Sequence, residues 1–172
     1  MTSRARPTLV AVDFSEDSKA ALAWACAFSA CAGGKLAVLH VVHDPADQPG
    51  YYRENHAKPL QTMEQAAEVM LSDFLASVQR ERPDMACLAN AEKLLLSGLP
   101  PGRIVEAAEM LNAKLIVIGS RGMTGLPHLL QGSVSERVVE LATRPVVVVK
   151  SANGRPAEKA KQQQEKNALK PA

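Results

Sequence analysis

The sequence predicts an α/β fold in which helices cover both faces of a mostly parallel, five-stranded sheet. Short apolar runs alternate with helical patterns five times along the 172 residues, as expected when right-handed crossovers join parallel strands. Apolar residues make up 47% of the chain and charged residues 22%, a composition that can form a buried core. We therefore expect one domain over residues 1–150 and a disordered tail over residues 151–172.

The five apolar runs are the predicted strands. They lie at residues 9–12, 35–42, 87–96, 115–118 and 146–149. The third run contains the adjacent Glu92 and Lys93, which do not fit burial on both faces. The fourth ends at Gly119 and has the pattern of a buried central strand.

Helical patterns fill the segments between these runs. Ser15 is expected to cap the first helix, which is rich in alanine. A long amphipathic helix is predicted over residues 60–82. The last helix begins at about residue 133 and is expected to bury Val134, Val138 and Leu141.

The composition disfavours several classes of partner. Of the 20 basic and 18 acidic residues of the chain, the tail carries five and two, which leaves 15 basic and 16 acidic residues in residues 1–150. This nearly neutral balance gives no electrostatic argument for binding nucleic acid. Aromatic residues, at 3%, are too few for a base-stacking platform. The longest apolar run, residues 20–28, is far shorter than the ~20 residues that cross a bilayer. We expect a cytoplasmic protein without membrane insertion, whose three cysteines are reduced and pack as small core residues.

The most informative segment follows the fourth strand. Gly119 and Gly122 come directly after a buried run, and nine residues later Gly132 and Ser133 precede the last helix. Glycine lets the backbone approach a ligand, and the free N–H groups at the start of a helix bind anions. Since ligands of open parallel sheets bind beyond the carboxyl ends of the strands, the pattern predicts a di- or triphosphate site. The alternative is that Gly122 and Gly125 only form turns and that Gly132 merely precedes a helix.

Other familiar sites are absent from the sequence. No Gly-Lys-Ser/Thr occurs, and Gly119, Gly122 and Gly125 are spaced by three, so neither a P-loop nor GxGxxG is present. Asp13, at the end of the first strand, could accept hydrogen bonds from ribose hydroxyls or could cap the next turn. No spacing indicates metal ligands or a hydrolase nucleophile, so we predict no catalytic and no metal-ligating residue.

These segments resemble the universal stress protein family, in its ATP-binding branch. Gly119, Gly122, Gly132 and Ser133 match the family's nucleotide motif G-x2-G-x9-G-[ST]. Residues 10–18 are similar to the family's first strand and loop, residues 39–42 to its second strand and residues 145–149 to its last. The likeness spans about residues 7–150, although a residue smaller than Phe14 is commoner at that position.

The resemblance implies a sheet of order 3-2-1-4-5, ATP as ligand with or without Mg²⁺, and a dimer. It implies that Val12, Asp13 and Phe14 bind the nucleotide, Asp13 by contacting the ribose or base. It also implies that Val41 contacts adenine through its backbone. The residues expected to line one side of the nucleotide are Gly119, Arg121 and Gly122. Those expected to hold the phosphates are Gly132, Ser133, Val134 and Ser135.

The last strand supports the expectation of a dimer. Four consecutive valines cannot alternate between core and solvent, so both faces of Val146–Val149 need cover. The last strand of an open sheet is expected at an edge, and bare edges invite pairing. Symmetric pairing with a second copy would cover this edge and bury the outward valines.

The sequence therefore predicts a nucleotide-dependent regulator or sensor in the stress response, a homodimer with an unidentified protein partner. One alternative is a slow ATP hydrolase in which Asp13 holds Mg²⁺. The other is a partner-binding scaffold without nucleotide. AMP, ADP or a cyclic nucleotide could replace ATP, because the predicted phosphate site does not indicate how many phosphate groups the ligand has.

Overall fold

Five parallel strands form one sheet in the order β3-β2-β1-β4-β5, which confirms the predicted fold class. The computed structural model describes residues 6–43, 62–122 and 134–151. The strands are β1 (Thr8–Ala11), β2 (Leu36–Val42), β3 (Glu92–Ser97), β4 (Leu115–Gly119) and β5 (Val146–Val149). In the central pair β1–β4, Thr8 lies opposite Leu115 and Ala11 opposite Ile118, so both strands end at the same edge.

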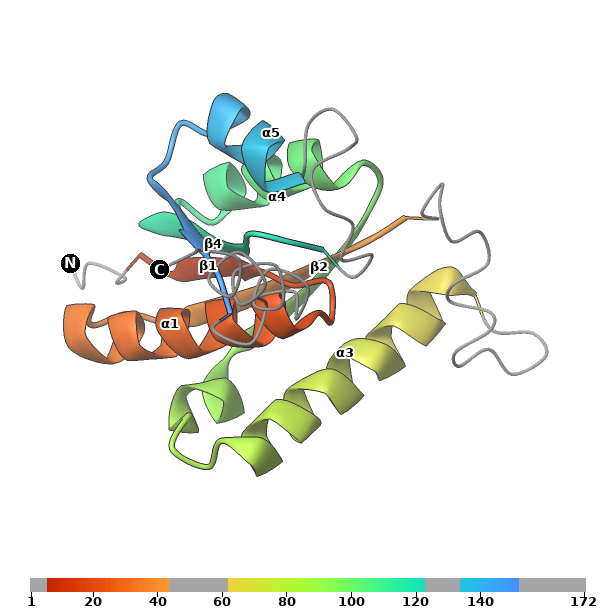
Figure 1. Ribbon diagram of the computed structural model, residues 1–172. Coiled ribbons are helices and arrows are strands. Elements are labelled where there is room, and N and C mark those ends of the chain that lie inside the picture. The colour runs from red at the N-terminus through yellow and green to blue at the C-terminus, as the bar shows by residue number, and fades with distance from the viewer. Residues whose placement is uncertain (1–5, 44–61, 123–133, 152–172) are drawn as a thin grey trace, which may run out of the picture.

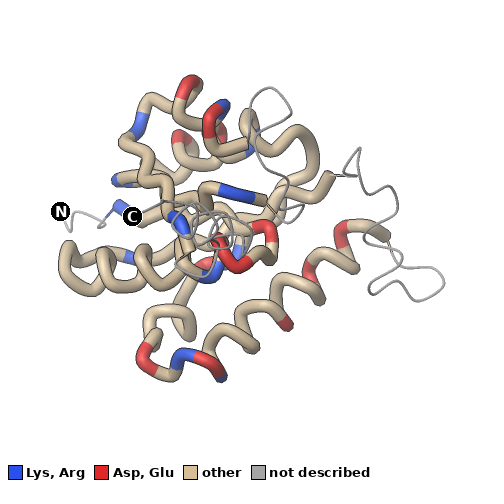
Figure 2. Tube along the Cα trace, viewed as in Figure 1, with Lys and Arg blue, Asp and Glu red and all other residues tan. Residues whose placement is uncertain are grey.

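Helices cover both faces of this sheet (Figure 1). The α-helices are α1 (Glu16–Ala32), α3 (Met63–Glu81), α4 (Pro100–Met110) and α5 (Val134–Leu141). Helices α1 and α3 lie on one face, and α4 and α5 lie on the other. Figure 2 shows that charges of both signs are distributed over the helices. Within the described ranges, no helix is long and apolar enough to cross a membrane.

Alternate residues of the central strands enter two separate cores, because side chains point to opposite faces along a strand. Val10, Val38 and Val117 pack toward α1 and α3. Leu9, Leu39 and Ile116 pack toward α4 and α5. Burial on both faces explains why these strands are continuous apolar runs.

Two predicted elements differ from the structure. Residues Ala86–Asn90 form a short 3-10 helix, η1, and the third strand starts only at Glu92. Because β3 is an edge strand, Glu92 and Lys93 remain exposed there. In α5, Val138 is buried as predicted, but Val134 and Leu141 are 40% and 47% exposed. The buried face of α5 consists of Ser135 and Val138 alone. This face is too narrow to include Val134 and Leu141, which lie beside it.

The cysteines are not all reduced, and that prediction was wrong. Cys26 in α1 and Cys87 in η1 form a disulfide, with their Cα atoms 5.8 Å apart. Cys31 is free and exposed. The pair is separated by 61 residues, so no local spacing indicated it.

Removing the disulfide should lower the free energy of unfolding by up to about 4 kcal/mol, because a cross-link spanning 61 residues restricts the unfolded chain. Urea denaturation of the Cys26→Ser/Cys87→Ser variant, compared with the oxidised native chain, measures this loss. Cys31→Ser is the matched control and should leave the midpoint unchanged, since Cys31 is exposed and unpaired. Equal stability of the double variant and the native chain would contradict the prediction.

Candidate functional site

The turn after β1 is built around the carboxylate of Asp13. Its Oδ1 accepts hydrogen bonds from the Ser15 N–H at 3.2 Å, the Ser15 hydroxyl at 2.6 Å and the Ser18 hydroxyl at 2.6 Å. The Asp13 N–H in turn donates to Ser18 Oγ at 2.9 Å. Ser15 caps α1, as predicted, by accepting from the Ser18 N–H. The capping role considered for Asp13 is therefore confirmed for one of its two oxygens.

The other carboxylate oxygen of Asp13 faces the chain after β4. A Cβ atom added at Gly122 would lie 3.0 Å from Asp13 Oδ2, closer than most real contacts. A side chain at position 122 would therefore crowd this oxygen, which lies at the carboxyl ends of β1 and β4. A carboxylate only accepts hydrogen bonds, so the group suits ribose hydroxyls or a hydrated cation.

The ring of Phe14 packs beneath this turn. Phe14 has φ = 69°, a left-handed conformation that bulky residues rarely adopt. Its ring centroid lies 4.3 Å from that of His40 and 5.4 Å from that of Phe74. Burial lowers the pKa of His40, and its Nδ1 lies 2.8 Å from the Val12 carbonyl oxygen. Because a carbonyl can only accept, the neutral ring carries its proton on Nδ1. The Phe14 side chain is thus part of the packing that holds the turn.

A second carboxylate, Asp17, joins three segments and was not predicted from the sequence. It lies in the first turn of α1 and is buried. Its Oδ2 accepts from the Ser120 hydroxyl at 2.7 Å and the Arg121 N–H at 3.0 Å. Its Oδ1 accepts from the Ser151 N–H at 3.2 Å and pairs with Arg121 Nη2 at 3.3 Å.

Asp17 is ionised at neutral pH. Burial alone would raise the pKa of Asp17, but hydrogen bonds from Ser120, Ser151 and Arg121 outweigh it and hold that pKa below its ordinary value. The charged carboxylate therefore ties the start of α1 to the chain that leaves β4 and to the chain that leaves β5.

Gly119 allows this close approach of α1. A Cβ atom at Gly119 would lie 2.9 Å from Asp17 Cβ and 3.0 Å from the Asp17 carbonyl carbon. Real Cβ atoms essentially never lie within 3.0 Å of another heavy atom, and Asp17 Cβ, the atom at 2.9 Å, is attached directly to the backbone of α1. The first glycine of the motif therefore has a packing role that the sequence interpretation had not assigned.

The other predicted residues are only partly assembled in the described ranges. Val12 and Val41 are buried, and the Val41 carbonyl oxygen lies 3.1 Å from His43 Nδ1. At the start of α5, Val134 is exposed and Ser135 is buried. Gly132 and Ser133 lie outside the described residues, as does the tail beyond Ser151. The structure thus brings together the β1 and β4 parts of the predicted site and leaves its phosphate-binding part untested.

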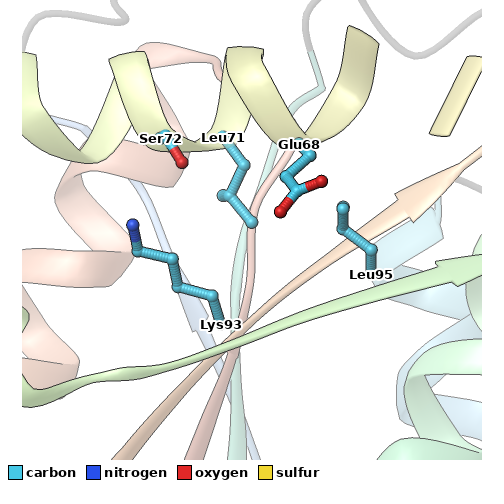
Figure 3. Close-up of a pocket in the computed structure, with 5 residues that line it drawn as sticks. All are labelled: Glu68, Leu71, Ser72, Lys93 and Leu95. Carbon is cyan, nitrogen blue, oxygen red and sulfur yellow. The ribbon is translucent and has the colours of Figure 1, made fainter. Parts of the chain in front are cut away.

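A separate cavity lies between α3 and the edge strand β3. Figure 3 shows the lining residues, with Glu68, Leu71 and Ser72 of α3 opposite Lys93 and Leu95 of β3. The volume of this cavity is about 340 Å³. None of the described residues predicted to bind nucleotide lines this cavity. No group of three or more His, Cys, Asp or Glu that could hold a metal ion occurs in the described part of the chain.

Similar chains occur among known proteins. A model of the Universal stress protein family matches residues 5–150. A universal stress protein of Thermus aquaticus is 34% identical over 145 residues, which cover 83% of this chain and 96% of that protein. One from Mycolicibacterium smegmatis is 32% identical over 144 residues, which cover 84% of this chain but 45% of that protein. The chain thus spans less than half the length of that relative.

A solved structure is similar over most of the chain. The universal stress protein from Archaeoglobus fulgidus in complex with dAMP is 26% identical, with a TM-score of 0.58. The match covers 86% of this chain and 99% of that one.

Substituting Gly119→Ala should destabilise the protein by about 1–3 kcal/mol, because the new Cβ would meet the Asp17 backbone and overpack the junction. Gly102→Ala is the matched control. Gly102 lies in α4 with nothing within 4 Å of an added Cβ, and alanine favours a helix. Thermal unfolding of both variants tests the contrast, and a Gly119→Ala variant as stable as Gly102→Ala would refute it.

Proposed function

Because this chain belongs to the universal stress protein family, we propose that it binds an adenine nucleotide, ATP, and acts as a nucleotide-dependent regulator or sensor in the stress response. The observation that carries the proposal is the position of Asp13 Oδ2 beside Gly122 at the carboxyl ends of two adjacent parallel strands. The dAMP complex of the Archaeoglobus fulgidus relative supports an adenine nucleotide as the ligand class.

The proposed roles follow from the chemistry of each group. Asp13 Oδ2 accepts hydrogen bonds from the ribose hydroxyls, while Ser15 and Ser18 keep the carboxylate oriented through Oδ1. The backbone of Val41 contacts adenine, and Gly122 leaves room for the nucleotide. Where Mg²⁺ accompanies ATP, Asp13 is the carboxylate proposed to bind it through water.

The phosphates are proposed to lie at the start of α5. Free N–H groups and the helix dipole at a helix N-terminus attract anions. The groups proposed to hold the phosphates are those of Gly132, Ser133, Val134 and Ser135, and Gly119 and Arg121 are proposed to line the opposite side.

We propose binding, rather than turnover, as the activity. Asp17 is the second described carboxylate at this edge, and its hydrogen bonds to Ser120, Arg121 and Ser151 leave it unsuited to act as a general base. Slow hydrolysis assisted by Asp13 and Mg²⁺ is the competing interpretation. A scaffold without nucleotide is the third. The proposed location is the cytoplasm, and the protein partner is unidentified.

We further propose a homodimer through β5. This strand lies at one end of the sheet, and Val148 is 41% exposed on it. Val139 and Leu141 of the adjacent α5 are 51% and 47% exposed. Pairing with a second copy would cover both the open edge and these apolar side chains.

ATP should bind the full chain in calorimetric titration, and Asp13→Asn should weaken it by about tenfold or more, because a charged acceptor is lost. Asparagine keeps an oxygen for the turn while replacing the second carboxylate oxygen. Asp73→Asn, an exposed aspartate of α3, is the control and should bind as the native chain does.

Two outcomes separate the competing functions, and a third measurement identifies the ligand. No heat with ATP, ADP, AMP or cyclic AMP would contradict nucleotide binding and favour the scaffold. Release of phosphate by the native chain but not by Asp13→Asn would favour the hydrolase. Mass spectrometry of small molecules released from denatured protein identifies which nucleotide copurifies.

Val148→Lys should convert the dimer to a monomer, because a buried lysine ammonium at the paired edge is costly. Light scattering coupled to size-exclusion chromatography measures the mass. The matched control is Val69→Lys, since Val69 is 43% exposed on α3, away from β5. A native chain that is monomeric at high concentration would disprove the proposed dimer.

A further inference from the structure

We infer that Asp17 is a positioning residue for nucleotide binding: its buried carboxylate sets the path of residues 120–122 without contacting the nucleotide. The inference rests on the proposed function, because it assigns what holds Gly122 next to Asp13. It adds a residue that lies outside the glycine motif and outside the turn formed by Asp13, Ser15 and Ser18.

The hydrogen bonds of Asp17 reach the two residues directly before Gly122. Oδ2 accepts from the Ser120 hydroxyl at 2.7 Å and from the Arg121 N–H at 3.0 Å. The second donor is a backbone group, so this bond fixes the direction of the chain rather than a side-chain rotamer. Gly122 directly follows Ser120 and Arg121. Because Asp17 holds these two residues, it also sets the position of Gly122 next to Asp13.

The guanidinium of Arg121 is bound to the same carboxylate. Arg121 Nη2 lies 3.3 Å from Asp17 Oδ1, and its side chain is 33% exposed against 5% for Asp17. An ionised carboxylate with so little exposed surface requires compensating donors, because leaving it unpaired is costly. Residues 120 and 121 are therefore strongly constrained to their observed positions.

The chain leaving β5 completes the junction. The Ser151 N–H donates to Asp17 Oδ1 at 3.2 Å, and the Ser120 N–H donates to the Val149 carbonyl oxygen at 2.8 Å. The exits of β4 and β5 are thus bonded to each other and to α1. A carboxylate that only favoured the helix dipole would need none of these partners.

The first test replaces Asp17 by an isostere without charge. Asp17→Asn should weaken ATP binding by about tenfold or more while the variant keeps its native circular dichroism, because the bonds to Ser120, Arg121 and Ser151 lose their charged acceptor. Asp84→Asn is the matched control. It breaks an exposed aspartate–arginine pair, with Arg82 at 2.7 Å, and should change the affinity by less than about twofold.

A second readout needs no nucleotide. Trypsin cleavage after Arg121 should rise in Asp17→Asn relative to cleavage after Arg103 in α4, because the guanidinium and the N–H of Arg121 lose a charged acceptor. A purely global loss of stability would raise both cleavages together. If the native chain binds no adenine nucleotide, the proposed function is wrong. If cleavage rises equally after Arg121 and Arg103, or if folded Asp17→Asn binds ATP with unchanged affinity, the inference is wrong.

A proline substitution at one of the donors to Asp17 tests the inference if Asp17→Asn does not fold. Ser151→Pro removes the N–H that donates to Asp17, whereas Ser151→Ala keeps it. ATP should bind Ser151→Pro about threefold or more weakly than Ser151→Ala, as expected for the loss of one hydrogen bond to a charged group. Equal affinities of the two variants would overturn the inference.

Discussion

The burial of an ionised carboxylate at Asp17 is the constraint on which the geometry of the site depends. A charge removed from water must be compensated by donors, and Ser120, Arg121 and Ser151 supply them. All three lie just beyond the carboxyl ends of β4 and β5. A parallel sheet determines where these strands end but not how the chain leaves them. The Asp17 carboxylate holds the backbone that follows each of these strands. The start of α1 then lies so close to β4 that only glycine fits at position 119.

Asp13 and Asp17 lie four residues apart, and their environments give them different roles. Asp13 is only partly buried, and one of its oxygens is bonded within its own turn while the other faces Gly122. Asp17 is buried, and both of its oxygens accept from distant segments. Asp13 therefore belongs to the turn after β1 and lies beside Gly122, whereas Asp17 holds the backbone that leads to Gly122. The glycines divide in the same way, since Gly119 faces Asp17 and Gly122 faces Asp13.

Local signals explain what could be predicted from the sequence. The alternation of apolar runs and helices predicted the parallel sheet, the family resemblance predicted its order, and Ser15 has the residue type and position of an N-cap. Asp17 was missed because an acidic residue in a first helical turn already has a local explanation, whereas its partner Ser120 lies 103 residues away. The Cys26–Cys87 disulfide was also missed because its two cysteines lie far apart in the sequence. In α5, periodicity shows which residues share a face, but the width of the covered face depends on tertiary packing, which leaves Val134 and Leu141 exposed.

The two edges of the sheet differ in a way that bears on association. Edge strand β3 begins with the exposed charges Glu92 and Lys93, and charges on an edge oppose pairing with another sheet. Edge strand β5 consists of four valines, and the backbone just beyond it is bonded to Asp17 through Ser151. An edge strand whose following backbone is already held in place loses less conformational entropy on pairing than an edge strand whose following backbone is not held. The charges on β3 and the anchoring of β5 therefore favour β5 over β3 as the edge for the proposed pairing with a second copy. The same carboxylate bonds to the chain near Gly122 and to the chain just beyond this edge.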